Sequence, residues 1–173
     1  MSSIFIGIDP GKLGHVASLS ADGGVRGTWP TPTIKMGKGK PQYDILSMRR
    51  ILKEATEGCD SVHVAIEKQT AMPMQGVVSM FSIGEGYGIW QGLLSGLELS
   101  YEVVTPQKWK KAMLAGIPGV GKDKKRSVIA AGRLFPGVDL RLNERCQVAC
   151  VDKCEALLIA EYGRRQECIM RKN

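Results

Sequence analysis

Four acidic residues occupy positions from which the folded chain could bring them together. Asp9 and Glu67 each end a segment in which apolar residues alternate with other residues, and the acid lies on the non-apolar face. Asp152 and Glu155 are three residues apart, so in a helix they project from one side. Carboxylate oxygens are the ligands that Mg²⁺ prefers, and four of them can hold two divalent ions about 4 Å apart.

The segments ending in Asp9 and Glu67 must be neighbouring parallel strands if these acids are to meet. The tips of such strands lie about 5 Å apart, and a helix packed over them would add Asp152 and Glu155. Without cations, four such carboxylates would repel one another and would repel phosphate. For an isolated acidic pair, solvent exposure is the simpler interpretation, but the combination of all four favours bound divalent ions.

The remaining pattern predicts a mixed α/β sheet covered by helices. Strands are predicted at 3–9, 15–20, 25–29, 62–67 and 101–104, the first three of them antiparallel. Helices are predicted at about 44–57, 75–97, 106–115, 123–135 and 143–164. Six glycines weaken the second helix, and the close approach of another helix or subunit would compensate. The length fits one domain, residues 1–173.

Basic residues exceed acidic ones along the chain. Twenty-four Lys and Arg against 17 Asp and Glu give a formal net charge of +7, which attracts polyanions through counterion release. Nucleic acid is therefore the leading candidate partner. We expect no membrane partner, because no apolar run approaches the ~20 residues of a spanning helix. The N-terminus predicts a strand and not a signal peptide, so we expect a cytoplasmic protein.

Five cysteines, an odd number, favour a reducing compartment. Cys146, Cys150 and Cys154 are spaced four apart on the last predicted helix, where disulfide geometry is seldom met. A metal site along this stripe is an alternative. Because no His lies near it, buried structural cysteines are the favoured interpretation.

Several motifs, in order and together, resemble the phage-encoded RuvC-type Holliday junction resolvases. These are Gly7-Ile8-Asp9-Pro10-Gly11, Ala65-Ile66-Glu67-Lys68-Gln69, residues 80–86 (MFSIGEG), residues 105–111 (TPQKWKK), and Asp152-x-x-Glu155 followed by ALLIAEY. Each motif alone is weakly specific, since similar starts occur in sugar kinases. The resemblance covers essentially the whole chain. The sequence departs from the family at Lys153, Cys154 and Glu155, where Gly, Ala and Asp are usual.

The resemblance implies an RNase H-like fold with a five-stranded mixed sheet flanked by helices. It also implies a DNA endonuclease that cleaves four-way junctions. Its metal ligands would be Asp9, Glu67, Asp152 and Glu155, holding two Mg²⁺ ions, with Mn²⁺ also supporting activity. Lys124, or Lys125 next to it, would stabilise charge at the cleaved phosphate. The family's dimer implies a homodimer, joined through the glycine-rich helix, whose two paired nicks leave 5′-phosphate and 3′-hydroxyl ends.

Basic residues expected to contact DNA lie in two regions. One is the glycine-rich loop 35–40, for which a merely solvated loop is an equal alternative. The other lies between the last predicted strand and the last helix, where the resemblance places DNA and a solubilising surface is the alternative. The set is Lys38, Lys40, Lys108, Lys110, Lys111, Lys122, Lys124, Lys125 and Arg126. Trp109, among them, is predicted to be a core residue and not a base-stacking platform.

Three other functions compete with that of a junction resolvase. The spacing from Gly116 to Lys122 imitates the phosphate-binding loop of NTPases, but Asp123 replaces the required Ser or Thr and a helix precedes the loop. A less selective nuclease of the same fold would act on forks, flaps or RNA–DNA hybrids. A non-catalytic junction-binding protein needs the positive charge but has no use for four converging acids.

Bacterial RuvC has an aromatic residue shortly after the second acid that wedges into the junction. In this sequence residues 70–74 contain no aromatic residue, and Met72 or Met74 could take that role.

Overall fold

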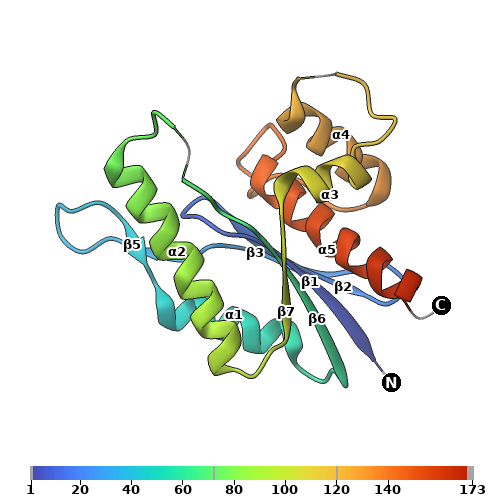
Figure 1. The fold of residues 1–173 in the computed structure, drawn as a ribbon, viewed down its shortest axis with the longest axis horizontal. Helices are drawn as coiled ribbons and strands as arrows, with labels where there is room; N and C mark the ends of the chain where they lie inside the picture. Colours follow the sequence, from blue (N-terminus) through green and yellow to red (C-terminus); the bar gives the residue numbers. More distant parts are fainter. Residues whose placement is uncertain (1, 72, 120, 171–173) are drawn as a thin grey trace.

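The described part of the chain, residues 2–71, 73–119 and 121–170, forms a mixed sheet between two layers of helices in a computed structural model (Figure 1). The five strands run in the order β3-β2-β1-β6-β7. They are β1 (Ser3–Asp9), β2 (His15–Ser20), β3 (Val25–Pro30), β6 (Ser61–Glu67) and β7 (Tyr101–Val104). The strand β1 pairs antiparallel with β2 and parallel with β6, so the tips that carry Asp9 and Glu67 are neighbours. The predicted five-stranded mixed sheet is confirmed.

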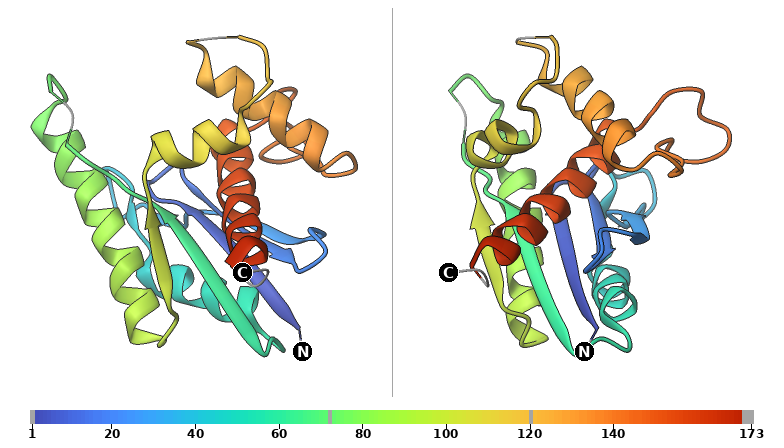
Figure 2. Two further views of the ribbon diagram at one scale, coloured as in Figure 1. Left: turned by 45° about the vertical axis from the view of Figure 1, so that its right-hand side comes forward. Right: turned by 90° about the vertical axis from the view of Figure 1, so that its right-hand side faces the viewer.

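Helices cover both faces of the sheet, and Figure 2 shows the two layers in profile. They are α1 (Ile45–Thr56), α2 (Val77–Gly96), α3 (Pro106–Met113), α4 (Asp123–Leu134) and α5 (Val151–Met170). Alternation along β1 divides the core: Ile4, Ile6 and Ile8 pack with α1 and α2, whereas Phe5 packs with α3, α4 and α5. The carboxylates of β1 and β6 therefore face the α5 side.

Gly7 allows α5 to lie directly on β1. A Cβ at this position would collide with the carbonyl oxygen of Ala156 and the backbone nitrogen of Ala160. Only glycine leaves room for such an approach. Farther along α5, a Cβ on Gly163 would meet the Cβ of Ala65 at 3.4 Å, an ordinary contact. The helix therefore begins over the carboxyl ends of β1 and β6 and runs toward their amino ends.

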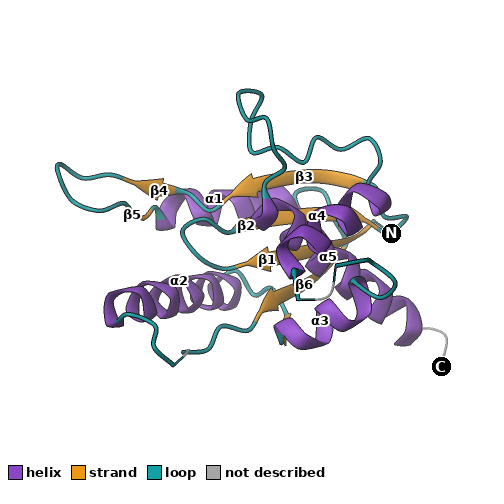
Figure 3. Ribbon diagram, turned by 90° about the horizontal axis from the view of Figure 1, so that it is seen from above, coloured by secondary structure: helices purple, strands orange, loops and turns teal. Residues whose placement is uncertain are grey.

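A small hairpin lies beside the α1 and α2 layer, formed by β4 (Thr33–Ile34) and β5 (Gln42–Tyr43). Its loop, residues 35–41, extends outward from the body of the molecule (Figure 3). Tyr43 is buried, and its hydroxyl donates a hydrogen bond to the backbone oxygen of Ser82 in α2 at 3.0 Å. The hairpin is thereby attached to α2.

Two expectations about the C-terminal region are wrong. The last helix begins at Val151, not near Asn143, because residues 141–149 form a loop closed by a bridge between Arg141 and Ala149. Cys146 and Cys150 therefore precede α5 and do not form a helical stripe with Cys154. All three carry free thiols, and burial raises the pKa of Cys154 to about 12.

None of the helices in the described part of the chain combines the length and apolar character needed to cross a membrane.

Candidate active site

The four predicted acids lie at one end of the sheet, under the first turns of α5. Asp9 and Glu67 end β1 and β6, while Asp152 and Glu155 fall in the first two turns of the helix. Asp9, Glu67 and Glu155 are buried residues, with exposed fractions of 8%, 7% and 9% for the whole residue, and Asp152 is partly exposed. The fold therefore brings together two strand tips and a helix start that are far apart in sequence.

The electrostatics of Asp9 shows how close these acids are. Burial raises the pKa of Asp9 well above its usual value, and the charges of Glu67, Glu155 and Asp152 raise it further, whereas Lys110 lowers it. Burial also raises the pKa of Glu67, with Glu155 adding to the shift. Burial and like charge both disfavour ionised carboxylates. The ionised cluster therefore needs a compensating positive charge.

Two side chains fix the Glu67 carboxylate. The indole Nε1 of Trp109 donates to Oε1 of Glu67 at 2.8 Å, and Nε2 of Gln69 donates to Oε2 at 2.9 Å. Trp109 is fully buried in α3, which confirms its predicted place in the core. Its hydrogen bond to Glu67 was not predicted, although a buried indole N–H usually finds an acceptor.

Glu155 is held by two other helices. The hydroxyl of Ser127 in α4, itself fully buried, donates to Oε1 of Glu155 at 3.0 Å. Nζ of Lys110 in α3 lies 3.7 Å from the same oxygen. Lys110 was predicted as a DNA contact only, and nothing in the sequence around Ser127 indicated its role.

His15 is a further polar residue beside the acids that sequence analysis missed. It pairs with Asp9 across β1 and β2, its side chain is buried, and its Nδ1 has no hydrogen-bond partner among the described residues. Burial lowers the pKa of His15, an effect that the charge of Asp152 opposes. A buried nitrogen close to the acids is therefore left without a hydrogen-bond partner in the described part of the chain.

The donor set fits hard divalent cations. Within residues 2–71, 73–119 and 121–170, no group of three or more His, Cys, Asp or Glu side chains is arranged so that it could hold a metal ion by itself. Mg²⁺ seldom needs one, because it keeps several waters and is commonly bound by one or two carboxylates together with substrate phosphate. Burial, together with neighbouring acids, raises the pKa of Asp9 and Glu67, so these carboxylates are suited to a cation that arrives with a phosphate.

A hollow lined by basic residues adjoins the acids. Lys110, Lys122, Lys124 and Lys125 line it with Gly121 and Asp123, and its volume is about 420 Å³. Lys110 belongs both to this hollow and to the Glu155 ion pair. Four of the predicted DNA contacts are therefore brought together in one hollow, and Lys110 among them contacts one of the acids.

The other predicted DNA contacts lie elsewhere. Lys108 lies with Nζ 5.9 Å from the ring centre of Tyr162, and Lys111 is exposed on α3. Lys38 and Lys40 are exposed in the β4–β5 loop. The guanidinium of Arg126 is engaged with the protein, as described next.

Arg126 closes the glycine-rich loop between α3 and α4. Its guanidinium donates to the backbone oxygens of Leu114 at 2.8 Å and Ile117 at 3.2 Å, and to the carboxylate of Asp123 at 3.2 Å. These bonds give it a structural role. The loop is preceded by α3 and not by a strand, which agrees with the argument against an NTPase.

Of the two possible wedge residues, Met72 lies outside the described residues. Met74 is fully exposed, with a positive φ of 64°.

Known proteins resemble this chain in structure but not in sequence. No protein-family model and no curated protein sequence matches the chain. The structure of RuvC from Thermus thermophilus in complex with a Holliday junction substrate matches with a TM-score of 0.61 and 14% identity, over 95% of this chain and 96% of that chain. A second structure of Thermus thermophilus RuvC matches with a TM-score of 0.53, the same identity and the same coverage.

The likeness shows that this chain has the RuvC type of RNase H-like fold. The predicted fold class is therefore confirmed.

Proposed function

We propose that this protein is a metal-dependent DNA endonuclease that resolves four-way junctions. The observation that carries the proposal is a group of three buried acids and one partly exposed acid, Asp9, Glu67, Glu155 and Asp152, beside a hollow lined by four lysines. A fold neighbour bound to a Holliday junction supports the choice of substrate. The proposed roles in the cell are DNA recombination and repair, in the cytoplasm of a bacterial host if the protein is encoded by a phage.

Asp9, Glu67, Asp152 and Glu155 would hold two Mg²⁺ ions, and Mn²⁺ would serve as well. When bound, such ions make water a better nucleophile and neutralise charge on the departing oxygen. Trp109 and Gln69 orient the Glu67 oxygens, and Ser127 and Lys110 orient Glu155. Such partners keep ligands in a productive arrangement and commonly contribute tenfold to hundredfold to metal affinity or activity.

The lysines of the basic hollow would bind the cleaved strand. Lys110 lies nearest to the acids, and Lys122, Lys124 and Lys125 extend the positive surface. Lys124 is proposed to stabilise the charge that develops on the phosphate. Hydrolysis would leave a 5′-phosphate and a 3′-hydroxyl.

A homodimer through α2 would cut the two strands symmetrically. Gly84, Gly88, Gly92 and Gly96 recur every fourth residue, are exposed, and would have open space around an added Cβ. Near the start of the same helix, Val77, Val78 and Phe81 are exposed with fractions of 76%, 69% and 74%. Small residues on a helix allow a second backbone to approach, and exposed apolar groups gain free energy when covered. Sedimentation of the wild type and of Phe81→Glu would test the dimer, which the variant should weaken.

The test of the proposed function uses synthetic four-way junctions, forks, flaps, RNA–DNA hybrids and linear duplex, each with and without Mg²⁺ or Mn²⁺. We expect paired nicks in the four-way junction that require the metal. Asp9→Asn and Glu67→Gln should still bind junctions but cut at least ~100-fold more slowly. Faster cutting of forks, flaps or hybrids would favour the less selective nuclease. Binding without cutting under all conditions would favour the non-catalytic alternative.

A further inference from the structure

A second hollow borders two of the acids, Asp9 and Asp152, between the β1–β2 loop and α2. Its volume is about 320 Å³, and its polar lining consists of Asp9, Lys12, Tyr43, Ser79, Ser82 and Asp152. Two of the proposed metal ligands are therefore shared with it. No role for Lys12 or for the two serines was predicted from the sequence.

The backbone of the β1–β2 loop fixes where Lys12 begins. The N–H of Gly14 donates to the carbonyl oxygen of Gly11 at 3.1 Å, which closes a tight turn around Lys12. Gly11 has a φ of 147°, and a Cβ on Gly14 would collide with the carbonyl oxygen of Asp9. The turn therefore requires glycine at these two positions. The closed turn keeps Lys12 at the end of β1, in the hollow that Asp9 also lines.

The side chain of Lys12 is directed by Tyr43. Its Nζ lies 5.2 Å from the centre of the Tyr43 ring, within the range of a cation–π interaction. The ring is itself held by its hydrogen bond to Ser82 and by close packing on Gly86, where an added Cβ would collide with the phenol. The ammonium group is thus held at the hollow by a buried and anchored ring.

The hollow combines one cation with hydroxyl donors. Ser79 accepts a hydrogen bond from Nε2 of Gln75 at 3.4 Å, so its own O–H can donate toward the hollow. Ser82 is partly buried and lines the same space. Lysine and hydroxyl groups are common partners of backbone phosphates in nucleic-acid complexes. An anion next to Asp9 and Asp152 would also be attracted by metal ions held there.

We propose that this hollow binds the phosphodiester next to the scissile one, with Lys12, Ser79 and Ser82 as its contacts. The inference rests on the proposed function. The cleaved strand would cross the acids from the basic hollow of Lys110, Lys122, Lys124 and Lys125 to the Lys12 hollow. Phosphates on both sides of the cleaved bond would then be held, which fixes the register of the strand over the catalytic acids.

The experiment compares Lys12→Gln with the wild type in single-turnover cleavage of a four-way junction with Mg²⁺. Lys53→Gln, an exposed lysine on α1, is the matched control. A second set of junctions carries a neutral methylphosphonate in place of the phosphodiester on one side or the other of the cleavage position. We expect about tenfold slower cleavage by Lys12→Gln, restored in large part by Lys12→Arg, and no change for Lys53→Gln.

The decisive measurement is the cleavage rate of Lys12→Gln on the junctions that carry the neutral methylphosphonate, compared with the wild type on the same junctions. On one side of the cleavage position, the neutral linkage should slow the wild type about tenfold but should slow Lys12→Gln hardly at all, because contacting groups are not additive. The salt dependence of junction binding should also become shallower by about one unit in Lys12→Gln. If the two effects multiply at both positions, Lys12 does not bind that phosphate and the inference is wrong.

Different results would contradict the proposed nuclease function and the proposed phosphate subsite at Lys12. If the wild type cuts no branched DNA with either metal, the proposed function fails. If the wild type cuts junctions and Lys12→Gln matches it in rate and in salt dependence, the nuclease assignment stands and only the second phosphate subsite is lost.

Discussion

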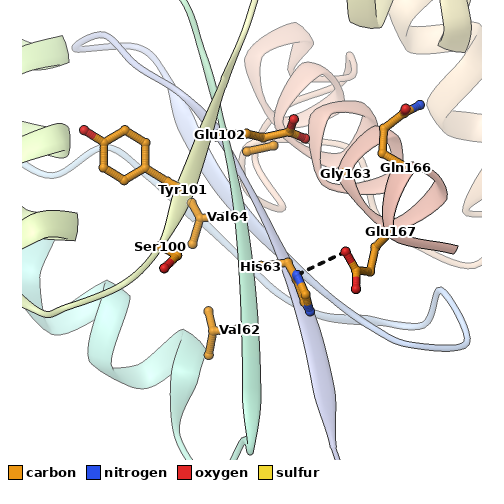
Figure 4. A pocket seen from close by; sticks show the side chains of 10 residues that line it. Val62, His63, Val64, Ser100, Tyr101, Glu102, Gly163, Gln166 and Glu167 are labelled. Carbon is orange, nitrogen blue, oxygen red and sulfur yellow. Dashed lines mark ion pairs between the residues drawn. The ribbon is translucent and has the colours of Figure 1, made fainter. Parts of the chain in front are cut away.

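The two ends of α5 cover two acid-bearing regions on the same face of the sheet. The start of the helix lies over Asp9 and Glu67. The end of the helix carries Glu167, whose carboxylate lies 3.8 Å from Nδ1 of His63 beside a pocket of about 220 Å³ that Glu102 also lines (Figure 4).

The two regions differ in how the negative charge is balanced. At the far end, Glu167 faces His63, whose imidazole is a cation only when it is protonated, and although burial raises the pKa of Glu102, the charge of Lys108 opposes the shift. At the near end, burial and the neighbouring acids together raise the pKa of Asp9, against Lys110. Acidic residues in a pocket are therefore a weak indication of function. Buried acids that face one another are a stronger one, because folding alone would not favour them.

The largest expected effect concerns the approach of α5 to the sheet. Gly7→Ala should lower the free energy of unfolding by about 3 kcal/mol or more, because its Cβ would meet the backbone of α5. Gly163→Ala, at the other end of the helix, should change it by less than about 1 kcal/mol, since the new contact is an ordinary one and alanine favours helix. Urea denaturation measures both, and equal losses would show that the helix is not seated as described.

The next largest effect concerns the free energy of unfolding of Asp9→Asn when no divalent metal is present. The raised pKa of Asp9 and Glu67 means that folding favours their protonated forms. This contribution is full below the pKa of the unfolded acids, about 4, and is lost as pH rises through the raised values. At neutral pH with a chelator, Asp9→Asn should therefore be more stable than the wild type by about 1–3 kcal/mol.

The control for this effect lies at the far end. Glu167→Gln should give no such gain, because Glu167 faces His63 rather than other acids. The measurement is urea denaturation from pH 5 to 8. A wild type that is no less stable than Asp9→Asn at neutral pH would show that burial and the neighbouring acids do not destabilise the ionised Asp9.

A smaller effect is expected from the groups that hold the ligands. Trp109→Phe keeps the buried ring but removes the donor to Glu67, so junction cleavage should fall about tenfold to hundredfold. Trp90→Phe is the matched control: Trp90 is equally buried on the other face, and its Nε1 has no partner within the described residues. Equal kinetic losses in the two variants would mean that the bond to Glu67 does not matter.

The smallest expected effect is a difference in cleavage rate between variants of two lysines of α3. Lys110 contacts Glu155 at the near end, whereas Lys108 lies over Tyr162 and close to Glu102. Lys110→Gln should slow cleavage about fivefold to tenfold, and Lys108→Gln by twofold or less. The reverse order, measured in single-turnover cleavage, would move the DNA path toward the far end.

Strand alternation and helix signals predicted much of the fold. The acids at positions 9 and 67 could be placed because each strand shows its apolar face in the sequence. The helix predicted from about residue 44 starts there because the side chain of Asp44 accepts a hydrogen bond from the N–H of Ser47 at 3.0 Å and so caps the helix. The start of α5 was misplaced because residues 143–150 contain no proline and no glycine to mark a boundary.

The partners of the acids could not be predicted in the same way. Ser127, Trp109 and Lys110 reach the acids only because α3 and α4 pack beside the start of α5, and such packing depends on tertiary contacts that no local pattern encodes. Arg126 shows the converse, since a basic residue in a basic segment is used to close its own loop. Charge in the sequence predicts a partner for the surface but does not assign each residue to it.

The acids at the start of α5 are proposed to bind divalent cations, and this binding can be measured directly. Calorimetric titration with Mn²⁺ and Mg²⁺ tests it in the wild type, in Asp9→Asn/Glu67→Gln, and in Glu102→Gln/Glu167→Gln as the far-end control. We predict that the wild type and the far-end variant bind the ions alike, and that the near-end variant binds them at least about tenfold more weakly. Equal binding by all three proteins would contradict the account.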